Sequence, residues 1–112
     1  MSLEVIHTEH GSDTSVFKLV GRLDATEAPL AYDRITGQLE NRFNVVLDLE
    51  GVDYISSGGL SIIIRLVHHL RDQGGELHLA AAQPFVKRVF DIVSFEAILK
   101  LFENVDSALE EF

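Results

Sequence analysis

The 112 residues have the usual length of one domain, and 46% hydrophobic with 24% charged residues is typical of a globular chain, so we expect residues 1–112 to form a single domain. There is no cysteine, which excludes disulfides, thiolate catalysis and zinc sites built from cysteine. The formal net charge of −9 repels nucleic acid and anionic membranes, so we expect neither as a partner.

The amino-terminal residues MSLEVIHTEH do not predict export. They have no positively charged start and no apolar stretch of signal-peptide length. The longest nearly apolar run, residues 60–67, is far too short to span a bilayer. We therefore expect a cytoplasmic protein.

The first two apolar segments predict a β-hairpin. Residues 3–7 roughly alternate between apolar and polar side chains, and residues 16–20 are rich in β-branched and aromatic side chains. Residues 9–13 between them have the composition of a turn. Two antiparallel strands joined by a loop of several residues follow from this pattern.

A helix is predicted from about residue 26 to 41, after residues 21–24 leave the second strand. Its apolar residues recur at helical spacing: Ala28, Ala31, Ile35 and Leu39. With Thr26 as the N-cap, Pro29 lies in the first turn, where its missing N–H group costs no hydrogen bond.

A buried strand and a second helix come next. Residues 45–49 are almost all apolar, as in a central strand, and residues 50–55 are expected to form a connection. A helical stripe then begins: Leu60, Ile63, Ile64, Val67 and Leu70. Gly74 and Gly75 are expected to end this helix, because glycine adopts the left-handed cap conformation without strain.

The remaining residues continue the alternation of strands and helices. We expect a strand at residues 76–80, a short helix opened by Pro84, a short strand or turn near residues 98–101 and a last helix at about residues 105–112. Strands that alternate with helices imply parallel strands joined by right-handed crossovers. The predicted fold is therefore α/β, with the initial hairpin as an antiparallel edge.

The segment YISSGGL, residues 54–60, joins the central strand to the second helix, where such folds carry function. A serine hydroxyl there can accept a hydrogen bond from a first-turn N–H group, which stabilises a helix by about 1 kcal/mol. One serine suffices for such a cap, and it requires no glycine. Two glycines leave the backbone open to another molecule, and a helix start tolerates a phosphoryl group. Ser56 and Ser57 therefore have two interpretations, as a helix cap or as a phosphate acceptor.

A catalytic or metal-binding role has less support. The G-x-S-x-G pattern is absent, and the sequence places none of the five histidines beside Ser57. His68 and His69 lack the i, i+4 spacing of a helical metal pair, so we interpret them as solvated helix residues. Asp24 leaves a strand at the same carboxyl edge. It is either a turn former or N-cap, or a neighbour of Ser57.

Five segments together resemble the STAS domain of bacterial anti-sigma-factor antagonists. They cover nearly the whole chain in the family's order and spacing: GRLD at 21–24, VVLDL at 45–49, YISSGGL at 54–60, GGEL at 74–77 and PFVKRVFD at 84–91. The resemblance implies a mixed, mostly parallel sheet of four or five strands with an N-terminal antiparallel hairpin and about four helices.

The resemblance also implies a switch that is not an enzyme. The unphosphorylated antagonist would bind an anti-sigma factor that is also a serine kinase, and a sigma factor would be released, so transcription is regulated indirectly. The phosphorylated form would bind poorly until a PP2C-type phosphatase resets it. No cofactor is expected on this chain, because ATP and Mg²⁺ would belong to the partner kinase.

Matched residue by residue, the resemblance places the phosphorylated serine at Ser57 and the acidic residue of the phosphorylation loop at Asp24. Many members have an aspartate directly before the serine. This chain has Ser56 there, which makes Ser56 an alternative acceptor and bears on kinase recognition. Gly58 replaces the usual serine, threonine or alanine, whereas Gly59 is retained. Asp24, Ser56, Gly58 and Gly59 are thus the expected residues of the partner-binding loop.

Three alternatives stay open. The chain could be a STAS interaction module that is never phosphorylated, acting as a scaffold in a signalling or lipid-transport complex. It could be an enzyme that uses Ser57, or a binder of a small ligand at the strand ends.

Overall fold

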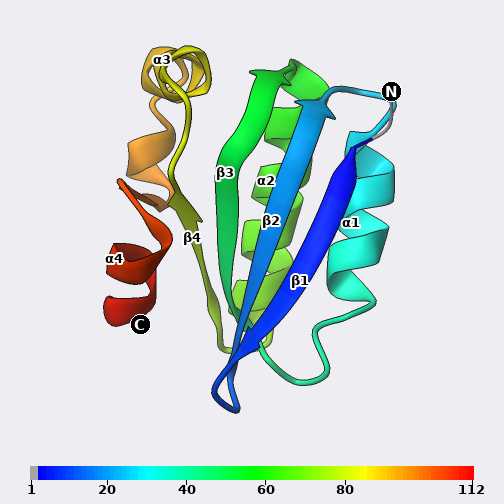
Figure 1. Cartoon of the computed structure of the whole chain (residues 1–112), viewed down its shortest axis with the longest axis vertical. Helices are drawn as coiled ribbons and strands as arrows, with labels where there is room; N and C mark the ends of the chain where they lie inside the picture. The colour runs from blue at the N-terminus through cyan, green and yellow to red at the C-terminus, as the bar shows by residue number, and fades with distance from the viewer. Residues whose placement is uncertain (1–2) are drawn as a thin grey trace.

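Five strands form one mixed sheet in the computed structural model, which describes residues 3–112 (Figure 1). The elements in chain order are β1 Glu4–His10, β2 Thr14–Leu23, α1 Ala28–Thr36, β3 Asn44–Ile55, α2 Ser57–Asp72, β4 Glu76–Ala80, α3 Pro84–Ile92, a 3₁₀ turn at Phe95–Ala97, β5 Lys100–Phe102 and α4 Val105–Glu110. The α/β fold predicted from the sequence is confirmed.

The strands lie in the order β1-β2-β3-β4-β5, so β3 is central. β1 pairs antiparallel with β2, which confirms the predicted hairpin. β2, β3, β4 and β5 are mutually parallel. Each parallel pair is connected through a helix, as crossover connections require.

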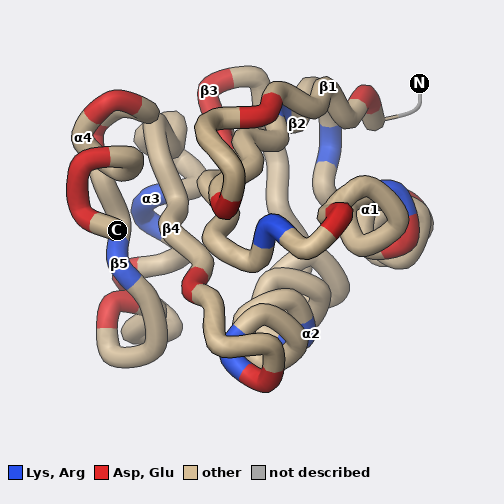
Figure 2. Tube along the Cα trace, turned by 90° about the horizontal axis from the view of Figure 1, so that it is seen from below, with Lys and Arg blue, Asp and Glu red and all other residues tan. Residues whose placement is uncertain are grey.

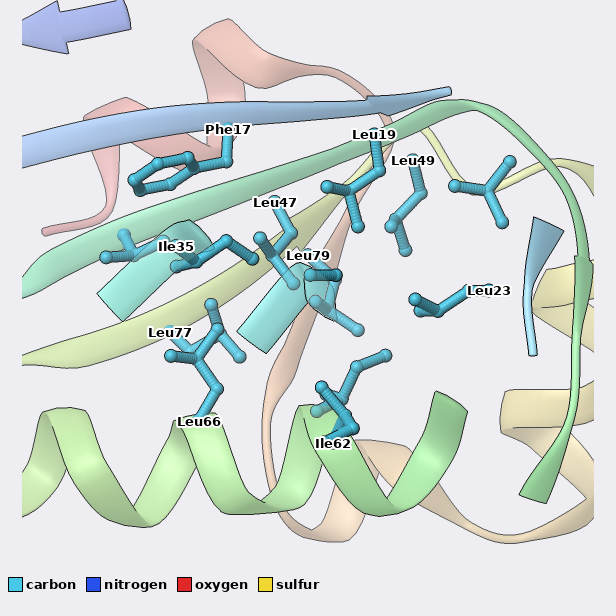
Figure 3. Packing of buried hydrophobic residues seen from close by; sticks show 14 of the residues in the cluster. Phe17, Leu19, Leu23, Ile35, Leu47, Leu49, Ile62, Leu66, Leu77 and Leu79 are labelled. Carbon is cyan, nitrogen blue, oxygen red and sulfur yellow. The ribbon is translucent and has the colours of Figure 1, made fainter. Parts of the chain in front are cut away.

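The helices lie in layers on the sheet. Seen along the strands, α1 and α2 lie side by side on one face and α4 lies on the other (Figure 2). The main core fills the space between the sheet and the first two helices, where inward side chains from three strands point toward them (Figure 3). A smaller cluster under α4 contains Val46, Ala80 and Ala108. The central strand is therefore covered on both faces, which explains its nearly continuous apolar sequence.

β3 is longer than the sequence predicts. The prediction that residues 50–55 form a connection is wrong, because the strand continues to Ile55. β2 likewise continues to Leu23 and supplies the hydrogen-bonding partner. Two register shifts in this pairing each add a residue to β3. Such bulges interrupt the alternation of side chains by which a strand is recognised.

The first helix is shorter than the predicted range of 26–41. Thr26 is not its N-cap, although Pro29 does lie in the first turn as predicted. After the helix, Glu40 and Asn41 have φ angles of 48° and 69°. These left-handed conformations are incompatible with a continuing helix, so the chain turns there toward β3.

The second helix begins at Ser57, before the predicted apolar stripe. Leu60 and Ile64 from that stripe are half buried, whereas six other positions face the core: Gly59, Ile62, Ile63, Leu66, Val67 and Leu70. Gly74 has a φ of 84° just after the helix, so the predicted glycine stop is confirmed.

The carboxyl-terminal elements largely follow the prediction. β4 and α3 occupy the predicted positions. The 3₁₀ turn at Phe95–Ala97 is not predicted, the short strand lies at Lys100–Phe102, and α4 ends at Glu110 instead of residue 112. Within residues 3–112, no helix is both long enough and apolar enough to cross a bilayer.

The position of Leu47 in the central strand gives a test of the core. Its side chain is 1% exposed, so Leu47→Ala should lower the free energy of unfolding by roughly 2–5 kcal/mol through lost burial and a cavity. Urea unfolding followed by circular dichroism would measure this loss. Leu30→Ala is the matched control, because Leu30 is 49% exposed on α1 and its truncation should change stability by less than about 0.5 kcal/mol.

Candidate functional site

The candidate site lies where β2 and β3 end and α2 begins, at one edge of the sheet (Figure 1). The last residues of the two strands pair with each other, Arg22 with Tyr54 and Leu23 with Ile55. The N–H group of Ser56 then donates to the carbonyl oxygen of Leu23 at 3.1 Å. These bonds fix the backbone of the serine pair relative to the sheet.

The two serines differ in their surroundings. Ser56 is the N-cap of α2, with extended backbone, and its Oγ accepts from the N–H group of Gly59 at 3.3 Å. Ser57 is the first helical residue and is exposed, and its hydroxyl makes no hydrogen bond with residues 3–112. The cap interpretation therefore applies to Ser56, whereas Ser57 projects a free hydroxyl beside the N-terminus of a 16-residue helix.

The two glycines contact the protein's own chain. A Cβ atom at Gly58 would lie 2.8 Å from the Cα atom of Ala25, and one at Gly59 would collide with the carbonyl oxygen of Leu23. The expectation that these positions leave the backbone open to another molecule is therefore wrong for Gly59, which is buried. Both glycines allow the segment after β2 to pack against the start of α2.

Asp24 organises this packed segment. Its Oδ1 accepts from the N–H groups of Thr26 and Glu27 at 3.1 and 2.9 Å, so its carboxylate caps the turn that leads into α1. Its Oδ2 lies 3.9 Å from the Nε of Arg22. Asp24 precedes Ala25, the residue that touches Gly58. The turn-forming interpretation is confirmed, whereas the predicted closeness of Asp24 to Ser57 stays a prediction.

A stacked group beside the serine loop is a feature that sequence reasoning missed. The guanidinium carbon of Arg22 lies 4.0 Å from the centroid of the Tyr54 ring. That ring stacks on Phe85 of α3, with centroids 6.2 Å apart and planes 14° apart. The three residues come from three elements, and only strand pairing and the position of α3 bring them together.

The histidines give no support to a serine hydrolase. Among residues 3–112, none of them hydrogen-bonds to Ser56 or Ser57. His7 contacts the Oγ of Ser15 at 2.9 Å, and His78 contacts the carbonyl oxygen of Ala108 at 2.8 Å. Within the same range, no three histidine or acidic side chains are arranged to hold a metal ion.

The family model for the STAS domain matches residues 5–108. The match runs from the second residue of β1 to Ala108 in α4, and it includes the whole site described above.

Sequence relatives and a solved structure agree with this match. BtrV of Bordetella bronchiseptica, provisionally named an anti-sigma factor antagonist, is 40% identical over 61% of this chain and 59% of its own length. The anti-sigma F factor antagonist of Paenibacillus polymyxa is 25% identical over 95% of this chain and 92% of its own. The Bacillus protein SpoIIAA in its phosphorylated form has the same fold, with a TM-score of 0.74 at 15% identity over 96% of this chain and 98% of its own.

The separate surroundings of the two serines predict different effects on stability. Ser56→Ala should lower the free energy of unfolding by about 1 kcal/mol, because Gly59 loses its cap acceptor. Ser57→Ala should change it by less than about 0.5 kcal/mol, because the exposed hydroxyl has no partner. Parallel urea titrations of both variants would measure this. Equal losses would contradict the assignment of the cap to Ser56.

Proposed function

The chain belongs to the STAS domain family, and we propose that it is an anti-sigma factor antagonist whose binding is switched off by phosphorylation of Ser57. In this proposal the unphosphorylated protein sequesters an anti-sigma factor that is also a serine kinase. It acts in the cytoplasm and regulates transcription indirectly. It performs no catalysis itself and holds no cofactor, since ATP and Mg²⁺ belong to the kinase and a PP2C-type phosphatase reverses the modification.

The free hydroxyl of Ser57 is the observation that carries the proposal. Ser56 is half buried and its Oγ already lies against the N–H group of Gly59, so its hydroxyl is less accessible to a kinase than that of the exposed Ser57. Phosphorylation of Ser57 breaks no hydrogen bond and adds negative charge where the helix dipole favours it. This contrast supports Ser57 over Ser56 as the acceptor.

A charge effect suffices for the switch. A phosphoserine carries about −1.5 to −2 charge at neutral pH. An unpaired charge desolvated in an interface costs several kcal/mol, and each 1.4 kcal/mol is about a tenfold change in affinity. The solved phosphorylated form of SpoIIAA supports the idea that this fold accommodates the modification. The switch therefore needs no large rearrangement of the domain.

The names of the sequence relatives support the partner class, since both are described as anti-sigma factor antagonists. The competing proposal is a STAS scaffold that is never phosphorylated. The scaffold proposal predicts the same fold and differs only in that Ser57 is not phosphorylated. Phosphorylation therefore decides between the two.

The first test is phosphorylation by the candidate kinases of the same genome. Incubation with ATP and Mg²⁺, followed by intact mass and peptide mapping, should add one phosphate, on Ser57. Ser57→Ala should remain unmodified, and Ser56→Ala should still be modified. Phosphate on Ser56 alone would move the site by one residue, and no phosphate with any of these kinases would favour the scaffold.

The second test is binding. Ser57→Asp should bind the kinase at least about tenfold more weakly than the wild type, as expected for a buried unpaired charge, in isothermal titration calorimetry. Ser57→Asn is the matched control of similar size without charge and should retain most of the affinity. Equal affinity of the Asp variant and the wild type would contradict the charge mechanism.

A further inference from the structure

We propose that the stacked group Arg22–Tyr54–Phe85 and the outer face of α3 form a docking surface that holds the kinase partner and determines which partner is accepted. The inference rests on the proposed function, because it assigns a second contact area to the same partner. It differs from the serine loop in its chemistry, which is aromatic, aliphatic and cationic.

The exposed apolar side chains are concentrated on this part of the molecule. Seven large apolar residues are exposed in the described chain, and three of them lie on α3 or directly after it: Phe85, Ile92 and Val93. Ile92 is 76% exposed, the largest value among the seven, and Phe85 is 52% exposed. Such clustering typically marks a site of interaction, whereas scattered single residues need no explanation.

The helix α3 carries apolar side chains on two of its faces, one buried and one exposed. Val86 and Phe90 are buried against the domain. Phe85, Arg88 and Ile92 follow the spacing i, i+3, i+7, which places them along one outer face, and all three are exposed. The first apolar face is explained by the core. On the second face Phe85 contacts Tyr54 but remains 52% exposed, and Ile92 is 76% exposed, so this face is accessible to another protein.

The stack at the start of α3 is preorganised. The ring of Tyr54 contacts both the guanidinium of Arg22 and the ring of Phe85. Aromatic and arginine side chains are the commonest hot spots of interfaces, and a side chain already fixed in the free protein loses less entropy on binding. These residues therefore have the composition and order of a binding centre.

This surface is continuous with the proposed switch. Tyr54 is the next-to-last residue of β3, two positions before Ser56, the N-cap of α2. Arg22 is next to the segment that packs on Gly58, and its guanidinium lies beside Asp24. The stack and Ser57 therefore both lie where β3 leads into α2, and we infer that one partner contacts both.

The charged residues on this face indicate which charges the partner's surface should carry. The chain has a net charge of −9, and the outer side of α3 carries Arg88 beside Asp91, while the stack carries Arg22. Arg88 makes no ion pair within residues 3–112, and Arg22 has only a 3.9 Å contact with Asp24. We infer a folded partner whose apolar patch is flanked by acidic side chains.

Phe85→Ala is the decisive variant. The purified kinase that phosphorylates Ser57 serves as the probe, and isothermal titration calorimetry measures its affinity for the full unphosphorylated chain. Loss of a hot spot should weaken binding about 30-fold. Arg88→Glu should weaken it too, and more at low salt than at high salt. In the phosphorylation assay both variants should raise the KM for the antagonist and leave kcat nearly unchanged, because they lose docking contacts and keep the acceptor.

Phe112→Ala is the matched control. Phe112 is also an exposed phenylalanine stacked on another ring, since it is 40% exposed and lies on His78. The C-terminus lies well away from α3 and the start of α2 (Figure 1). Its truncation should leave the affinity within about twofold of the wild type. Urea unfolding of each variant confirms that the domain is folded.

Four results decide the matter. Weaker binding of Phe85→Ala with an unaffected control supports the docking surface. Wild-type affinity of both Phe85→Ala and Arg88→Glu overturns it and leaves the switch at Ser57 intact. A wild-type protein that neither binds nor is phosphorylated by any such kinase overturns both proposals. A wild-type dimer in sedimentation experiments that Phe85→Ala dissociates, with unchanged kinase affinity, assigns the surface to a second copy instead.

Discussion

The close approach of β2's end to the start of α2 is the constraint on which the site depends. Ala25 and the carbonyl of Leu23 occupy the space that side chains at residues 58 and 59 would need. Because that space is filled by the chain itself, the segment after β2, the end of β3 and the first turn of α2 form one packed unit. A larger residue at Gly59 would separate these elements, and the positions of Asp24 and Ser57 would change together.

This packed unit lets neighbouring serines have separate roles. Ser56 accepts a hydrogen bond from Gly59 and so stabilises the first turn of α2. Ser57 is one residue further on, exposed and without a partner, and so is free for chemistry. An aspartate at position 56 could also accept the hydrogen bond that Ser56 accepts, since both are good N-caps. A serine and an aspartate at this position would therefore give the same helix start and differ in the charge that they place beside Ser57.

The sequence predicted what depends on local pattern. The apolar run of β3, the helical stripes and the turn glycine Gly74 identified most elements, and the serine segment was correctly placed at the start of α2. The length of β3 was missed because its bulges disrupt the alternation of side chains. The role of Gly59 was missed because its neighbour, Leu23, is remote in sequence. The stack of Arg22 on Tyr54 and Phe85 was missed for the same reason, since only the register of two strands and the position of α3 create it.

Timing and selectivity can then be controlled by different residues. A phosphate at the start of α2 would stabilise the helix by about 0.3–1 kcal/mol, so the fold does not oppose the modification. The phosphate would instead destabilise the complex with the partner, because its charge would be desolvated in the interface. Under the proposal, the stack and α3 contribute contacts that do not depend on phosphorylation. If those contacts set the starting affinity and the phosphate lowers it, then Ser57 governs when a partner is released, whereas Arg22, Phe85 and Ile92 govern which partner is held.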